Sequence, residues 1–112
     1  MSDMSNQLVV IKPYALLFQA LSNQTRMQLL LALREREAMN VTQLSQELGL
    51  EQTSVSHNLR CLSFCGLVSV ERRGKSRIYS LNKETVPPIL DIAENHLRKY
   101  AENLLSCDVL KR

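Results

Sequence analysis

The stretch VTQLSQELGLEQTSVSHNLRCLSFCG, residues 41–66, has the spacing of two short helices joined by a tight turn. Asn40 followed three residues later by Gln43 resembles a capping box, which predicts a helix over Val41–Leu48. A second helix is expected over Glu51–Phe64, and a glycine follows each of the two. The pattern is typical of a helix-turn-helix.

The second of these helices is predicted to have three different faces. When its residues are plotted at about 100° each, an apolar stripe about 60° wide emerges, as expected for a core-facing side. That stripe contains Val55, Leu59, Leu62 and Gly66. One flank contains Ser56, His57 and Arg60. The other flank contains Ser54, Asn58, Cys61 and Cys65.

A hairpin is predicted directly after the second helix. Leu67–Arg73 and Ser76–Leu81 are rich in β-prone residues and are separated by Gly74 and Lys75. The hairpin ends in four cationic side chains, which belong to Arg72, Arg73, Lys75 and Arg77.

Three further helices are expected outside this region. One spans Pro13–Leu21 after an N-terminal arm at residues 1–12, with the proline at the first helical position, where its missing N–H costs nothing. Another begins after Asn23 and runs to Glu35. A last helix, about 86–105, has a broad apolar face suited to a dimer contact. The expected fold is a mainly α winged helix-turn-helix with a β-hairpin wing, dimeric through its first and last helices.

Size and composition favour one small intracellular domain over the full 112 residues. The chain is 45% hydrophobic but only 4% aromatic, which favours a compact, helix-rich protein over a disordered or fibrous one. No apolar run is long enough to span a bilayer, and the N-terminus lacks the features of a signal peptide. A cytoplasmic location without a membrane partner is therefore expected.

The net charge of +3 is concentrated in one region of the chain. Acidic and basic residues balance over 1–50 and over 82–112, so the whole surplus lies in residues 51–81. A cationic hairpin beside a helix-turn-helix favours a polyanion such as double-stranded DNA. Short polar and cationic side chains suited to bases and phosphates are Gln52, Thr53, Ser54, Ser56, His57 and Arg60 on the helix, and Arg72, Arg73, Lys75 and Arg77 on the hairpin. The alternative is a solvated helix face and a charged edge that discourages aggregation.

The residues also carry a family resemblance. LSNQTRMQLLLAL, residues 21–33, and VTQLSQELGLEQTSVSHNLRCLSFCGLVSVERRGKSRIYSL, residues 41–81, resemble the ArsR/SmtB family of metal-responsive repressors. The stretch LRCLSFCGLV, with a third cysteine far toward the C-terminus, is similar to the cadmium and lead sensors of the CmtR type. The resemblance implies a homodimer that binds operator DNA without metal and releases it when metal binds.

Three cysteines without a secretion signal favour thiol chemistry over a disulfide framework. Cys61 and Cys65 lie four residues apart, so their Cβ atoms are about 6 Å apart on one helix face and both sulfurs can reach one ion. Cys107 completes the set if the C-terminal segment of either protomer approaches the pair. Three thiolates favour Cd(II) or Pb(II), with As(III) or Hg(II) as alternatives, whereas a structural Zn(II) usually takes four ligands. Buried apolar packing is the competing interpretation of the two helical cysteines.

Other hypotheses remain open at this stage. A repressor of the same fold that senses thiol oxidation or persulfides is the main alternative. The family resemblance also implies a possible zinc site at Glu94 and His96, because other members place carboxylate and histidine ligands on the last helix. His57 could ligate beside Cys61, although DNA contact suits it better. An enzyme is not expected, because no orienting group accompanies a cysteine and histidine pair. A metal-free interaction module is the last alternative.

Overall fold

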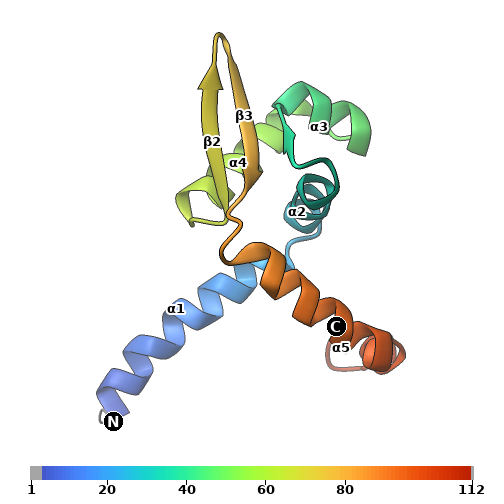
Figure 1. Ribbon diagram of the computed structural model, residues 1–112. Helices are drawn as coiled ribbons and strands as arrows, with labels where there is room; N and C mark the ends of the chain where they lie inside the picture. Colours follow the sequence, from blue (N-terminus) through green and yellow to red (C-terminus); the bar gives the residue numbers. More distant parts are fainter. Residues whose placement is uncertain (1–3, 112) are drawn as a thin grey trace. The chain divides into compact units, whose positions relative to one another are not determined.

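The computed structural model describes residues 4–111 and divides the chain into two compact units, Met1–Leu81 and Asn82–Arg112 (Figure 1). Over the described residues, the elements are α1 (Met4–Ser22), α2 (Gln24–Arg36), β1 (Ala38–Met39), α3 (Val41–Leu48), α4 (Gln52–Phe64), β2 (Val68–Arg73), β3 (Ser76–Leu81) and α5 (Val86–Leu105). Helix-turn-helix, hairpin and terminal helix follow one another as the winged helix prediction requires.

The helix-turn-helix forms because its ends are closed by local hydrogen bonds. The Asn40 side chain accepts from the Gln43 N–H at 2.8 Å, and the Gln43 side chain accepts from the Asn40 N–H at 2.8 Å, which confirms the capping box. Gly49 ends α3 in the left-handed conformation, with φ of 67°. The turn is closed further by the Ser45 hydroxyl, which donates to the Leu50 carbonyl.

The wing is the hairpin of β2 and β3, which belongs to an antiparallel sheet with strand order β1-β3-β2. In the predicted hairpin, Val70 pairs with Tyr79 and Arg72 pairs with Arg77. Strand β1 was not predicted from the sequence; it pairs with β3 through Ala38 and Met39. Two residues are too few to show the alternation that identifies a strand, so β1 depends on a partner strand from a distant part of the sequence.

The core of the first unit lies among α2, α3, α4 and the base of the wing. Val55, Leu59 and Leu62 are completely buried, which confirms the apolar stripe of α4. Each such side chain contributes about 1.5–3 kcal/mol through burial. Gly66 does not belong to the stripe: the helix ends at Phe64, and Gly66 is an exposed turn residue with φ of 80°.

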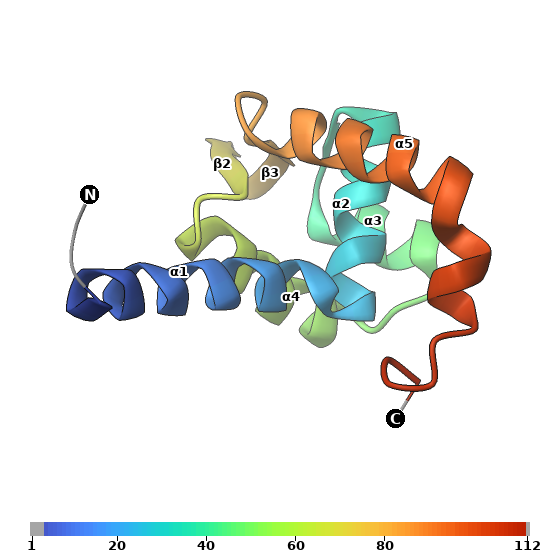
Figure 2. The ribbon, with the colours of Figure 1, turned by 90° about the horizontal axis from the view of Figure 1, so that it is seen from below.

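The N-terminal prediction was wrong in its boundaries. Helix α1 begins at Met4, so the part of the expected arm that is described, residues 4–12, is helical, while residues 1–3 lie outside the described part (Figure 2). Pro13 lies inside the helix. A proline removes one helical hydrogen bond and favours a kink, but it does not end a helix whose flanking turns are otherwise satisfied.

The second unit consists of α5 and a short C-terminal turn. Helix α5 spans the predicted residues, and its prolines lie in the first turn. After the helix, the Cys107 N–H donates to the Leu104 carbonyl at 3.2 Å, and the Cys107 carbonyl accepts from the Lys111 N–H at 3.1 Å. Within the described residues, no helix combines the length and the apolar character needed to cross a membrane.

Candidate nucleic-acid interface and thiol pair

The polar residues predicted to face DNA lie at the surface of α4. Gln52, Thr53, His57 and Arg60 are exposed, and Ser54 and Ser56 are half-buried. Because the opposite side of α4 is buried in the core, this polar flank cannot turn inward without exposing three apolar side chains. The helix therefore presents small hydrogen-bonding groups and one guanidinium outward, in a form suited to a DNA groove.

The wing places its cations close together. Arg72, Arg73, Lys75 and Arg77 are all exposed, and Arg72 stands directly opposite Arg77 in the β2–β3 register. Like charges in opposite positions destabilise a strand pair, so a bound polyanion would relieve this repulsion. Arg73 is partly neutralised by an ion pair with Glu71 at 3.0 Å.

A surface hollow of about 250 Å³ lies between the wing and α4, the recognition helix of the helix-turn-helix. It is lined by Ser56, Arg60, Ser63, Phe64, Val70, Arg77 and Tyr79. Two guanidinium groups from different elements thus border the same space, which spacing in the sequence could not show. Phe64 is 93% exposed at the end of α4 and was not singled out from the sequence, although its place outside the apolar stripe was a signal.

Cys61 of α4 and Cys65 at its C-terminal end interact with each other. Cys61 is half-buried, and Cys65 is exposed immediately after the helix, where its N–H donates to the Cys61 carbonyl at 3.0 Å. The pKa of the Cys65 thiol is raised, first by partial loss of hydration, then by the charge of Cys61 and a side-chain hydrogen bond with it. The nearby Arg26 acts in the opposite direction. Two interacting thiols suit a soft ion, but they leave its ligand set incomplete.

Asn58 and Arg26 form a polar cluster next to this pair. Asn58 is buried, with 9% of its surface exposed, although the sequence had placed it simply on a polar flank. Its Oδ1 atom accepts from the Arg26 guanidinium at 3.3 Å, and its Nδ2 atom donates to the Ser54 carbonyl at 2.9 Å. Arg26 was missed because nothing in the local pattern of α2 shows that its side chain reaches two other helices.

The remaining metal candidates lie in the second unit. Cys107 follows α5 and is half-buried. The Glu94 carboxylate pairs with Arg98 at 3.7 Å, and the His96 ring stacks near Tyr100 with centroids 4.8 Å apart. Across residues 4–111, no three His, Cys, Asp or Glu side chains gather as a metal-binding group. Completing the coordination of an ion on Cys61 and Cys65 therefore requires a donor beyond the pair, so the three-cysteine site stays a prediction.

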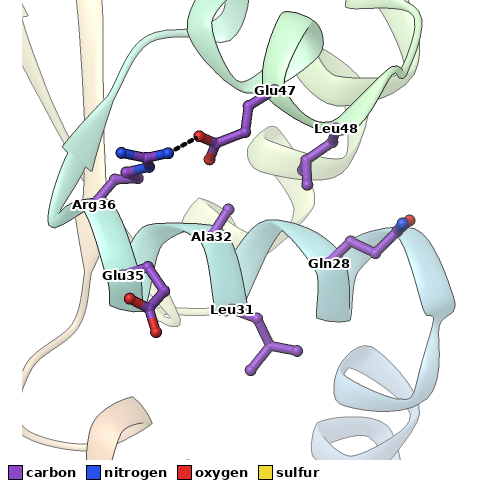
Figure 3. A pocket seen from close by; sticks show the side chains of 7 residues that line it. All are labelled: Gln28, Leu31, Ala32, Glu35, Arg36, Glu47 and Leu48. Atoms are coloured by element: carbon purple, nitrogen blue, oxygen red, sulfur yellow. Dashed lines mark ion pairs between the residues drawn. The ribbon is translucent and has the colours of Figure 1, made fainter.

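A larger hollow, about 460 Å³, is lined by residues of α2 and α3 (Figure 3). Its one ion pair joins Arg36 to Glu47 at 2.6 Å and closes one end. Figure 3 shows the Leu31 and Glu35 side chains pointing away from Ala32 and the α3 residues. Polar groups do not converge there, so the hollow lacks the arrangement of a small-molecule site.

A winged helix-turn-helix with a polar recognition helix and a cationic wing is the architecture of a DNA-binding transcription regulator. Residues 23–70 match the model described as bacterial regulatory protein, arsR family. The chain is 42% identical to the transcriptional regulator NmtR of Mycobacterium tuberculosis over 78 residues, which cover 70% of this chain and 64% of NmtR. It is 30% identical to a cadmium resistance transcriptional regulatory protein, the CadC homolog of Staphylococcus aureus, over 78% of this chain and 72% of that protein. The chain belongs to the ArsR family of helix-turn-helix transcriptional regulators.

Solved structures confirm the fold. The solution structure of apo-NmtR has a TM-score of 0.68 at 36% identity and covers 88% of this chain and 80% of the NmtR chain. The homodimeric winged helix-turn-helix domain of Mb0332 from Mycobacterium bovis has a TM-score of 0.77 at 23% identity, covering 89% and 92% of the two chains. The family is one of transcription regulators and is not enzymatic in general, which agrees with the sequence-based expectation.

Proposed function

We propose that this protein is a homodimeric cytoplasmic repressor that binds operator DNA when free of metal and releases it when a soft thiophilic ion binds. The single observation that carries the ion response is the interaction of Cys61, within the recognition helix, with Cys65 at the C-terminal end of that helix. The cadmium resistance named for the CadC homolog supports the same class of effector. Cd(II) and Pb(II) are the proposed ions, closest to the behaviour of CmtR-type sensors.

DNA binding would use both cationic elements of the first unit. The exposed flank of α4 would enter the major groove, and the wing would contact the backbone or the minor groove. The hollow shared by Arg60 and Arg77 suits a backbone phosphate. In a dimer these elements occur twice, so the operator would be an imperfect palindrome.

Ion binding would use three thiolates. Cys61 and Cys65 supply two donors from one helix face, and Cys107 of either protomer is proposed as the third. Such a set favours Cd(II), Pb(II), As(III) or Hg(II) over Zn(II), which usually takes four ligands. An ion held between α4 and the C-terminal segment would restrain the recognition helix. A typical allosteric coupling of about 1–3 kcal/mol would change operator affinity about 5- to 150-fold.

Operator affinity with and without cadmium tests the proposal. A DNA duplex is first selected from random sequences by gel shift, and its affinity is then measured by fluorescence anisotropy. The wild type should lose affinity on adding cadmium, while Cys61→Ser and Cys65→Ser should bind DNA as before and ignore the ion. Equal affinities of the wild type with and without cadmium or lead would overturn the ion response.

The number of ligating thiols is tested separately by ultraviolet thiolate-to-metal charge transfer. Cys107→Ser should show a weaker band per bound cadmium than the wild type, because one thiolate is lost. An unchanged band would remove Cys107 from the site.

The contact between the thiols also supports a redox sensor as a second candidate. Cysteines four residues apart on a regular helix are poorly placed for an unstrained disulfide, but Cys65 lies just beyond the end of α4. Mass spectrometry after a mild oxidant distinguishes the two. A disulfide that abolishes DNA binding, together with no effect of cadmium, would favour the redox function.

A further inference from the structure

Arg26 connects three helices of the first unit through one side chain. Its Nε atom donates to the Ala20 carbonyl at 2.7 Å, and one terminal nitrogen donates to the Gln19 carbonyl at 3.3 Å. Both carbonyls belong to the last turn of α1, where backbone oxygens lack helical partners. The other terminal nitrogen donates to Oδ1 of Asn58 on α4 at 3.3 Å. A side chain of α2 thus holds the end of α1 and the middle of the recognition helix.

This connection is costly to break. A guanidinium has its donors in a rigid planar fork, so a lysine cannot reproduce contacts to three acceptors in different directions. Asn58 is buried, and removing its partner leaves its Oδ1 atom without a hydrogen bond in a poorly hydrated place. The Asn58 amide is in turn held by the Ser54 carbonyl, so the orientation of both groups is determined.

The connection also lies on the side of α4 that carries the thiols. Asn58 precedes Cys61 by three residues, which places both on one flank of α4, and Cys65 follows at the C-terminal end of the helix. An ion that draws Cys61 and Cys65 together would move the last turns of α4, and Asn58, one turn before Cys61, would move with them while Arg26 stays anchored to α1.

We propose that Arg26 is a positioning residue that holds the recognition helix in place relative to α1. Occupation of the cysteine pair then changes operator affinity through the Arg26–Asn58 hydrogen bond. With no ion bound, the Arg26–Asn58 hydrogen bond holds α4 in its operator-binding position. When an ion binds Cys61 and Cys65, the end of α4 shifts and the Arg26–Asn58 hydrogen bond weakens, while the contacts of Arg26 with α1 remain. The ion-dependent part of this inference rests on the proposed function.

The test is the ratio of operator affinities without and with cadmium, measured for four proteins. Arg26→Gln should bind the operator about tenfold more weakly than the wild type without ion, and its ratio should fall below about twofold. Asn58→Ala removes only the α4 end of the connection and should reduce the ratio in the same direction. Arg36→Gln is the matched control, because this arginine of α2 pairs with Glu47 of α3 (Figure 3). Its ratio should equal that of the wild type.

Two further measurements separate positioning from mere loss of structure. Cadmium charge transfer should show that Arg26→Gln still binds the ion through its thiolates, and circular dichroism should show a folded protein. If Arg26→Gln does not fold, Asn58→Ala decides, since it leaves the contacts between Arg26 and α1 in place. A responsive wild type together with a folded variant that keeps the full ratio would overturn the inference alone. A wild type that ignores cadmium would overturn the proposed function and the ion-dependent step with it.

Discussion

Cys61 and Cys65 differ in their surroundings although they lie one helical turn apart. Cys61 is half-buried within α4, and Cys65 is exposed at its end. Partial loss of hydration and the proximity of Cys61 both raise the pKa of Cys65, so its proton stays bound at neutral pH. An ion that takes both sulfurs must displace that proton. Ion affinity is therefore coupled to pH at this residue.

Cadmium affinity should rise as pH increases between about 6 and 8, because Cys65, whose pKa is raised, must release its proton when the ion binds. The slope of log affinity against pH should be lower by about one in Cys65→Ser than in the wild type. Competition with a chelator of known affinity measures it. Equal slopes for the two proteins would contradict ligation by Cys65.

The same shift has the opposite effect on folding. A thiol whose pKa is raised in the folded protein binds its proton more tightly there than in the unfolded chain. The resulting stabilisation is present below the ordinary thiol pKa and is lost as pH rises through the raised value. Without metal, the wild type should therefore lose unfolding free energy relative to Cys65→Ser above about pH 9. Urea titrations at several pH values measure this loss.

At the scale of single elements, α3 depends on its caps. The helix spans only Val41–Leu48, and so short a helix is not stable by itself in water. The reciprocal hydrogen bonds of Asn40 and Gln43 satisfy two of its N-terminal groups. Since α3 supports α4, the capping box contributes to the placement of the recognition helix.

Asn40→Ala should lower the free energy of unfolding by about 1 kcal/mol, because the first turn of α3 loses a capping acceptor. Urea denaturation followed by circular dichroism measures the change. Gln46→Ala is the control, since this exposed residue of α3 lies outside the cap. Alanine has a higher helix propensity than glutamine, so the control should not lose stability. A loss as large in the control would mean that the effect is not specific to the cap.

The wing and α4 share the other element-scale prediction. Arg77→Gln should weaken operator binding by a similar factor for every DNA sequence and should reduce the slope of log affinity against log salt by about one. The reason is that its guanidinium borders the hollow suited to a phosphate. Affinities measured over a salt series test this. Lys12→Gln on α1 removes the same charge and should leave the slope unchanged; a sequence-dependent loss in Arg77→Gln would instead indicate contact with a base.

At the scale of the whole molecule, both terminal helices expose apolar side chains. Helix α1 exposes Val10, Ile11, Tyr14, Leu16 and Phe18. Helix α5 exposes Ile92, Leu97, Tyr100, Leu104 and Leu105. Soluble monomers rarely leave such rows uncovered. In the proposed homodimer, a second copy of this chain would cover these rows.

Phe18→Glu should convert the dimer into a monomer, because it puts a charge into the apolar row of α1. Its affinity for a full palindromic operator should fall by more than about tenfold, while binding to a half-site changes little. Sedimentation equilibrium and gel shift measure the two effects. Gln46→Glu on α3 adds the same charge elsewhere and should remain dimeric; a dimeric Phe18→Glu would exclude α1 from the interface.

Local patterns predicted most of the fold. The capping box, the apolar stripe at Val55, Leu59 and Leu62, and the hairpin each depend on residues a few positions apart. The predictions failed where contacts between distant segments, or the whole length of a helix, decide the structure. Strand β1 exists because β3 lies beside it, and α1 continues through Pro13 because one missing hydrogen bond does not end a helix. The candidate site likewise has a part that local patterns predicted and a part that depends on contacts between separate elements.

The sequence by itself determined the family, the helix-turn-helix and the cationic wing, because each depends on patterns of residues that are close together in the chain. Only the tertiary structure brought Arg60 and Arg77 to one hollow, buried Asn58, and linked it through Arg26 to the end of α1. These contacts join residues from separate elements. Their distances depend on how the helices pack around the core, and no local pattern records that packing.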